Sequence, residues 1–88
     1  MDETYLNHPN FGLLFSLCRL EKDKLLYTTL YAQRLFFIVL VEDEGIHFES
    51  ITRQEAKGIV ENRLRDLRRA GSIPDFQNLQ VIYKQTFQ

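Results

Sequence analysis

The period of the apolar residues changes at Thr52, and this change constrains the fold more than any other feature of the 88-residue chain. Before Thr52, short segments rich in aliphatic and aromatic residues are separated by charged turns, which is typical of β-strands. After Thr52, apolar residues recur at helical spacing, which is typical of amphipathic helices. We therefore expect two parts, a β domain over residues 1–51 and a two-helix hairpin over residues 52–88.

Four segments of the first part have the composition and length of strands. They are Phe11–Leu20, Leu25–Tyr31, Arg34–Val41 and Ile46–Ser50. Charged turns follow the first segment at Glu21–Lys24 and the third at Glu42–Gly45. In the last segment Ile46 and Phe48 alternate with polar residues, which predicts one buried and one solvent-exposed face. Short strands joined by tight turns predict a small antiparallel barrel or a strongly bent sheet.

Two helices are predicted in the second part. Thr52 and Glu55 form a capping box, in which each side chain accepts a hydrogen bond from a free amide of the first turn. The apolar stripe that follows consists of Ala56, Ile59, Val60, Leu64 and Leu67. Gly71 should end this helix, and Ser72 followed by Pro74 should begin the next. The short connection predicts antiparallel neighbours. The apolar stripe of the second helix consists of Phe76, Leu79, Ile82 or Tyr83, and Phe87.

Motifs for catalysis and for cofactor binding are absent from the sequence. The four glycines are isolated, so there is no phosphate-binding loop. Neither histidine, His8 or His47, has a metal-ligand spacing to Cys18. Cys18 lies in an apolar predicted strand, where a small buried hydrophobic residue is expected. We therefore expect no enzymatic activity, no cofactor and no metal.

The cysteine content and the N-terminus bear on the compartment. A single cysteine allows no internal disulfide and favours a reducing environment. The first residues lack the basic and apolar regions of a signal peptide, and no apolar run approaches the length of a membrane span. We expect a cytoplasmic protein that does not contact membranes.

Charge differs between the two parts of the chain. Residues 1–50 carry four basic and eight acidic residues, whereas residues 51–88 carry seven basic and four acidic residues. This asymmetry indicates two surfaces with different partners.

The third predicted strand is apolar on both sides. If Phe36 and Ile38 face the core, then Phe37 and Val39 face the opposite way, because side chains alternate along a strand. A small barrel with a helix packed against it explains two buried faces at these positions.

The segment that precedes this strand is harder to explain by burial alone. Residues 31–35 join two strands through Gln33, so their side chains should reach the surface. Tyr31 and Arg34 are of the types that are enriched at interface hot spots. With Leu35 they form an apolar patch rimmed by polar residues, which is typical of a docking site.

Arg63, Arg65, Arg68 and Arg69 cluster toward the end of the first predicted helix. One interpretation is compensation of the helix dipole together with an ion pair between Glu61 and Arg65. The other is a patch that binds an acidic protein surface or nucleic-acid phosphate. A sequence pI of about 6.1 argues against a domain that binds nucleic acid alone.

Five segments carry a resemblance to a known family, namely Tyr5–Pro9, Phe11–Leu14, Thr28–Phe37, Val60–Arg65 and Tyr83–Gln88. They resemble the cyanobacterial PII-interacting proteins called PipX. The similarity runs almost end to end, and Thr28–Phe37 is its most specific part. The resemblance implies an N-terminal Tudor-like antiparallel β-barrel followed by a C-terminal pair of antiparallel α-helices.

The resemblance also implies a function. Members of this family are nitrogen-signalling adaptors. When 2-oxoglutarate is abundant they bind the dimeric transcription factor NtcA as a coactivator. When 2-oxoglutarate is low and ADP is favoured, the trimeric PII signalling protein captures them through the same barrel face, so the two partners exclude each other. The partners sense the effectors, so the adaptor is expected to have no direct small-molecule ligand and to reach DNA only through NtcA.

Contact residues are implied by matching position. They are Glu3, Tyr5, Asp23, Tyr31, Gln33, Arg34, Leu35 and Phe37. Among them Tyr31 and Leu35 would be apolar anchors, and Arg34 would pair with a carboxylate or with backbone carbonyls. The resemblance also allows a further transcription regulator to contact the C-terminal helices, for which we expect Arg65, Arg68 and Arg69.

Three other readings stay open at this point. The main one is an RNA- or ribosome-associated Tudor-like binding module, since related barrels occur in that setting and the C-terminal part is basic. The second is an enzyme, which would need a cofactor or metal that no motif of the sequence indicates. The third is a structural subunit, which would have a permanent partner and no control by ligands.

Overall fold

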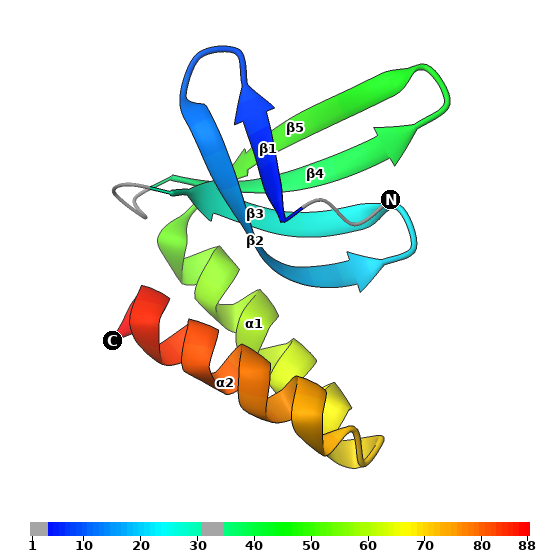
Figure 1. The fold of residues 1–88 in the computed structure, drawn as a ribbon, viewed down its shortest axis with the longest axis vertical. Coiled ribbons are helices and arrows are strands. Elements are labelled where there is room, and N and C mark those ends of the chain that lie inside the picture. Colours follow the sequence, from blue (N-terminus) through cyan, green and yellow to red (C-terminus); the bar gives the residue numbers. More distant parts are fainter. Residues whose placement is uncertain (1–3, 31–34) are drawn as a thin grey trace.

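Five antiparallel strands form a single sheet in which sequence neighbours are also spatial neighbours, in the order β1-β2-β3-β4-β5. The structure, a computed structural model, describes residues 4–30 and 35–88. The strands are β1 (Tyr5–His8), β2 (Gly12–Glu21), β3 (Lys24–Thr29), β4 (Phe36–Glu42) and β5 (Gly45–Ile51). The sheet curls into a half-barrel above two helices (Figure 1). The predicted architecture of a small antiparallel barrel followed by two helices is confirmed.

The sequence patterns found the last four strands but missed β1. This strand pairs with β2 in the register Tyr5 to Phe15, and the amide of Ser16 extends the pairing by donating to the carbonyl of Thr4 at 2.8 Å. β1 is only four residues long, and Leu6 is its single aliphatic residue. A segment this short has too few alternations to reveal a strand period, so only its partner strand identifies it.

The curl of the sheet encloses a core on its concave side. The register of β2 against β3 shifts twice, between Ser16 and Cys18 and between Arg19 and Glu21. Such irregularities bend a strand and increase its twist, which lets β2 wrap around the sheet. The enclosed residues, called the inner cluster below, are Leu14, Leu25, Tyr27, Phe37 and Val39.

The helices begin and end where the sequence indicates. α1 (Arg53–Arg69) begins after Thr52, whose hydroxyl accepts from the amide of Glu55 at 3.0 Å while the Glu55 carboxylate accepts from the amide of Thr52 at 3.0 Å. The predicted capping box is therefore confirmed. Gly71 follows α1 with a φ of 73°, a left-handed conformation that glycine adopts without steric cost. α2 (Ile73–Phe87) then returns antiparallel to α1 (Figure 1).

A second core lies between the convex side of the sheet and the helix pair. Its buried residues, called the outer cluster, are Leu17, Leu26, Phe36, Ile38, Ala56, Val60, Leu67, Leu79 and Phe87. At its centre the rings of Phe36 and Phe87 stack with centroids 5.5 Å apart and planes 17° apart. The guanidinium carbon of Arg53 lies 5.4 Å from the centroid of the Phe87 ring. The helices are thus packed on the sheet.

Two expectations about burial have different outcomes. Phe36 and Ile38 face the outer cluster whereas Phe37 and Val39 face the inner cluster, so the predicted alternation in β4 is confirmed. The prediction that Ile46 lies on a buried face is wrong, since its side chain is 45% exposed. Ile46 pairs with Val41 beside the tip of the β4–β5 hairpin, which extends beyond the residues of the inner cluster.

Candidate docking surface

Leu35 lies on a rigid backbone although its side chain is exposed. The carbonyl of Leu35 accepts two hydrogen bonds, from the Thr28 hydroxyl at 2.8 Å and from the Thr29 amide at 3.1 Å. Its own amide donates to the Thr29 hydroxyl at 3.5 Å. The side chain is 38% exposed. An apolar side chain that is held out by a fixed backbone loses little conformational freedom when a partner covers it.

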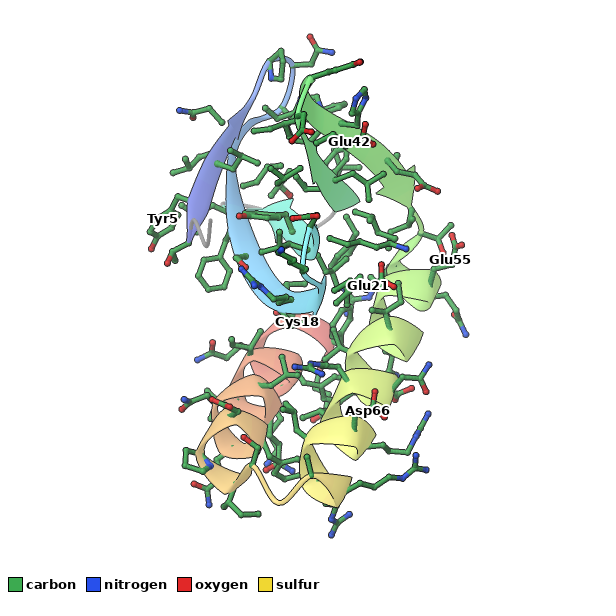
Figure 2. The ribbon with its side chains drawn as sticks, turned by 90° about the vertical axis from the view of Figure 1, so that its right-hand side faces the viewer. Tyr5, Cys18, Glu21, Glu42, Glu55 and Asp66 are labelled. Carbon is green, nitrogen blue, oxygen red and sulfur yellow. The ribbon has the colours of Figure 1, made fainter. Side chains whose placement is uncertain are left out.

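Tyr5 lies at the same end of the sheet as Leu35. The pairing runs from Tyr5 to Phe15, from Phe15 to Thr28 and from Thr28 to Phe36, the residue that follows Leu35. Tyr5 is 50% exposed and its ring centroid is 5.9 Å from that of Phe15. Figure 2 shows Tyr5 projecting from the edge of the sheet. We call this end of the sheet, with Tyr5 and Leu35 on it, the candidate docking surface.

Two of the other implied contacts lie elsewhere. Phe37 is only 3% exposed, so it supports the sheet from within and offers a partner almost no area. Asp23 lies in the β2–β3 turn, where its carbonyl accepts from the amide of Val41 at 2.9 Å. The six residues of β3 separate it from Leu35, which corresponds to about 20 Å along the strand. The structure therefore places Tyr5 and Leu35 at the same end of the sheet and Asp23 at the opposite end.

The remaining implied contacts are not placed. Glu3, Tyr31, Gln33 and Arg34 lie outside the described residues. Three of them belong to the segment directly before Leu35. Because these four residues are not described, their assignment remains a prediction.

An aromatic group that the sequence patterns missed closes the open side of the half-barrel. The ring of His8 lies 4.6 Å from Phe48, 4.9 Å from Phe11 and 5.0 Å from Phe37, measured between centroids. Its Nδ1 atom accepts from the amides of Asn10 at 3.0 Å and Phe11 at 3.3 Å. His8 thereby connects the β1–β2 hairpin to β4 and β5. The sequence signal at this position is the pair Pro9-Asn10 directly after His8. It indicates a turn but not which residues the His8 ring contacts.

The arginines at the end of α1 are exposed. The guanidinium carbon of Arg68 lies 5.8 Å from the centroid of the Phe76 ring on α2. Arg65 donates to the side chain of Asn62. Glu61 accepts from the Tyr83 hydroxyl at 2.6 Å, and this hydrogen bond raises the pKa of Tyr83. Among the described residues, Glu61 bonds to Tyr83 and Arg65 bonds to Asn62, and the expected ion pair between Glu61 and Arg65 is not formed. Arg65, Arg68 and Arg69 therefore remain accessible to a partner.

Cys18 is the single cysteine of the chain and lies in β2. Burial raises the pKa of the Cys18 thiol to about 11, and the charge of Arg63 offsets only part of this effect. A thiol with so high a pKa is a poor nucleophile at neutral pH. Within residues 4–30 and 35–88, no three His, Cys, Asp or Glu side chains are grouped so that they could hold a metal ion. Neither described helix is long and apolar enough to cross a membrane.

Comparison with known proteins places the chain in a family. The family model described as "PipX: PII-interacting protein X" matches residues 2–87, which is nearly the whole chain. No curated protein matches it.

Proposed function

The chain belongs to the PipX family of PII-interacting proteins, and from this premise we propose that it is a nitrogen-signalling adaptor that binds PII or, alternatively, NtcA. With NtcA it acts as a coactivator of nitrogen-regulated genes. The observation that carries the proposal is the family match over residues 2–87, which includes both the candidate docking surface and the helix pair.

The geometry of the candidate docking surface supports this role. Tyr5 and Leu35 present apolar area at one end of the sheet, and the segment 31–34 directly precedes Leu35 in the sequence. Tyrosine is among the residue types that are enriched at interface hot spots, and a backbone fixed before binding lowers the entropic cost of covering an exposed Leu. In the proposal Tyr5, Tyr31 and Leu35 bury against the partner, and Arg34 and Gln33 bond to its polar groups.

One surface shared by two partners gives a switch without any conformational change in the adaptor. The effector-dependent affinities of PII and NtcA set the partition, and a tenfold change in either affinity corresponds to about 1.4 kcal/mol. 2-Oxoglutarate and the ratio of ADP to ATP act on the partners.

The helix pair is proposed to contact a further regulator while the candidate docking surface is occupied. Arg65, Arg68 and Arg69 are exposed at the end of α1, far along the helix from its junction with β5 (Figure 1). A charge reversal at Arg68 and Arg69 should abolish such binding and leave PII binding unchanged. Unchanged capture of the regulator would exclude this contact.

Titration against purified PII tests the proposal. Wild-type protein should bind in the presence of ADP and should bind more weakly with ATP plus 2-oxoglutarate. Leu35→Ala and Tyr31→Ala should each weaken binding by about tenfold or more, as expected for an interface anchor. Ile46→Ala is the matched control, because Ile46 is 45% exposed but lies near the other end of β4.

The outcomes separate the candidate functions. NtcA loaded with 2-oxoglutarate should compete with PII for the wild type. Absence of binding to PII under both nucleotide conditions would refute the adaptor function, and salt-dependent binding to RNA would then support the Tudor-like RNA module.

A further inference from the structure

A cleft lies between β2 and the helix pair, away from the candidate docking surface. Its volume is about 400 Å³, and β2, α1 and α2 all contribute to its walls. Figure 2 shows Cys18, one of its lining residues, where β2 approaches the helices. The register shift between Ser16 and Cys18 lies at this point of β2. Bulges of this kind are frequent beside binding sites, because they redirect the side chains of one strand.

The chemistry of the cleft combines an apolar floor with a positive wall. Leu67 and Leu79 are buried members of the outer cluster, and they line the cleft together with Cys18. Arg19 from β2 and Arg63 from α1 line it as well, and both side chains are partly buried. Part of each arginine stem is therefore covered, which limits the positions that the guanidinium groups can take.

Arg63 supplies the positive charge that an anion in the cleft would bind. Asp75 is the one acidic lining residue, and its carboxylate already accepts from the Ser72 hydroxyl at 2.8 Å. Arg63 pairs with no carboxylate among the residues that the structure describes. Cys18 lines the same cleft, and the charge of Arg63 opposes the burial that raises the pKa of its thiol. A guanidinium group binds a carboxylate with two parallel hydrogen bonds.

We propose that this cleft binds a small organic carboxylate, with the carboxylate on Arg63 and the apolar body of the ligand over Leu67 and Leu79. The volume is within the range of small-molecule sites. The Asn78 side chain, at the α2 side of the cleft, offers one more hydrogen bond. A ligand here would contact β2 and both helices at once, so it would stabilise the helix pair on the sheet. This site goes beyond the adaptor function, whose family resemblance implies no direct small-molecule ligand.

Titration with 3-phenylpropionate, followed by amide chemical shifts of the full-length protein, tests the proposal. A probe of this size should bind with a dissociation constant of a few millimolar, as its number of non-hydrogen atoms predicts. The saturable shifts should centre on Cys18, Arg19 and Asn78. The neutral analogue 3-phenylpropanamide should bind about tenfold more weakly, because it lacks the charge-assisted hydrogen bonds.

Two variants complete the test. Arg63→Gln should weaken binding of the carboxylate about tenfold and leave the weak binding of the amide unchanged. Arg69→Gln, on the same helix but outside the cleft, should change neither. Equal affinity for the two probes, an unaffected Arg63→Gln variant, or no saturable shift would each overturn the proposal. Binding of an acidic peptide in the absence of any phenylpropionate binding would overturn it in favour of a protein ligand. Since PII is absent from this experiment, its outcome is independent of the adaptor function.

Discussion

The two faces of the sheet are both apolar, yet they are covered in different ways. The inner cluster is covered by the curl of the sheet itself, and all its residues belong to β2, β3 and β4. The outer cluster is covered by the helix pair, which contributes Ala56, Val60, Leu67, Leu79 and Phe87. The inner cluster therefore cannot be opened without disrupting strand pairing, whereas the outer cluster can be opened by moving the helices as a unit. This difference predicts that mutations in the inner cluster will destabilise the whole domain, whereas mutations in the outer cluster will destabilise mainly the helices.

Phe37→Ala should have the largest effect, because it removes a ring from the inner cluster. Phe37 is 3% exposed and its ring contacts His8, Phe11 and Phe48. A buried Phe→Ala change costs about 3–5 kcal/mol, which is a large share of the stability of a domain this small. Urea unfolding should show strands and helices lost together at a lower midpoint. Retained strand structure with selective loss of helix would contradict the assignment of Phe37 to the core that holds the sheet.

Phe87→Ala should have a smaller and more local effect. Phe87 is 6% exposed, stacks on Phe36 and lies beneath Arg53. We expect a loss of about 3 kcal/mol, at the low end for a buried ring, because the last turn of a helix relaxes easily. Amide hydrogen exchange should accelerate in α2 and α1 while β2–β4 keep their protection. Val81→Ala is the matched control on α2, since Val81 is 55% exposed and should change neither helix. Equal acceleration in strands and helices would show that both clusters unfold as one unit.

The Cys18 thiol gives a pH-dependent probe of the outer cluster. Burial raises its pKa from 9.0 to about 11. Below pH 9 the thiol is neutral in both states, so its contribution is fully present. Between pH 9 and 11 the unfolded chain loses the proton while the folded protein retains it, so stability falls as the pH rises. The loss should be on the order of 3 kcal/mol, since each unit of pKa difference corresponds to about 1.4 kcal/mol.

The difference in unfolding free energy between wild type and Cys18→Ala measures this term, because the tyrosines and lysines titrate alike in both proteins. The unfolding free energy of the wild type relative to Cys18→Ala should be constant at pH values below 9. It should then decrease as the pH rises from 9 to 11. A difference that does not depend on pH would mean that solvent reaches the thiol and that the outer cluster is open at this point.

The sequence predicted the parts of this fold that are encoded locally. The Thr52–Glu55 capping box and the turn at Gly71 depend on a few adjacent residues, and both are present. The alternation of Phe36 and Phe37 onto opposite faces follows from strand geometry, so it was predictable as well. What the period could not show is which face the curl covers and which face the helices cover. That choice depends on the bulges of β2 and on long-range packing such as the contact of Phe36 with Phe87.

The candidate docking surface was predictable to a similar extent. Residue types and family resemblance indicated Tyr5 and Leu35, and the structure places both at one end of the sheet. The separation of Asp23 from Leu35 and the burial of Phe37 depend on strand register, which a single sequence specifies poorly. The contact between the rings of His8 and Phe48 joins residues that are remote in the chain, and no local sequence pattern indicates it.

Thr52→Ala should have the smallest effect. It tests the junction between β5 and α1, where the sheet is connected to the helix pair. Thr52 lies directly after β5, and its hydroxyl satisfies the amide of Glu55. Loss of an N-cap side chain costs about 1 kcal/mol. Because the cap acts on α1 alone, hydrogen exchange should accelerate in the first turn of that helix and leave the inner cluster unchanged. Thr52→Ser, which keeps the hydroxyl, should retain most of the stability. If both substitutions cost the same, the methyl group and not the cap holds α1 at the edge of the outer cluster, and the helix pair is attached to the sheet by packing alone.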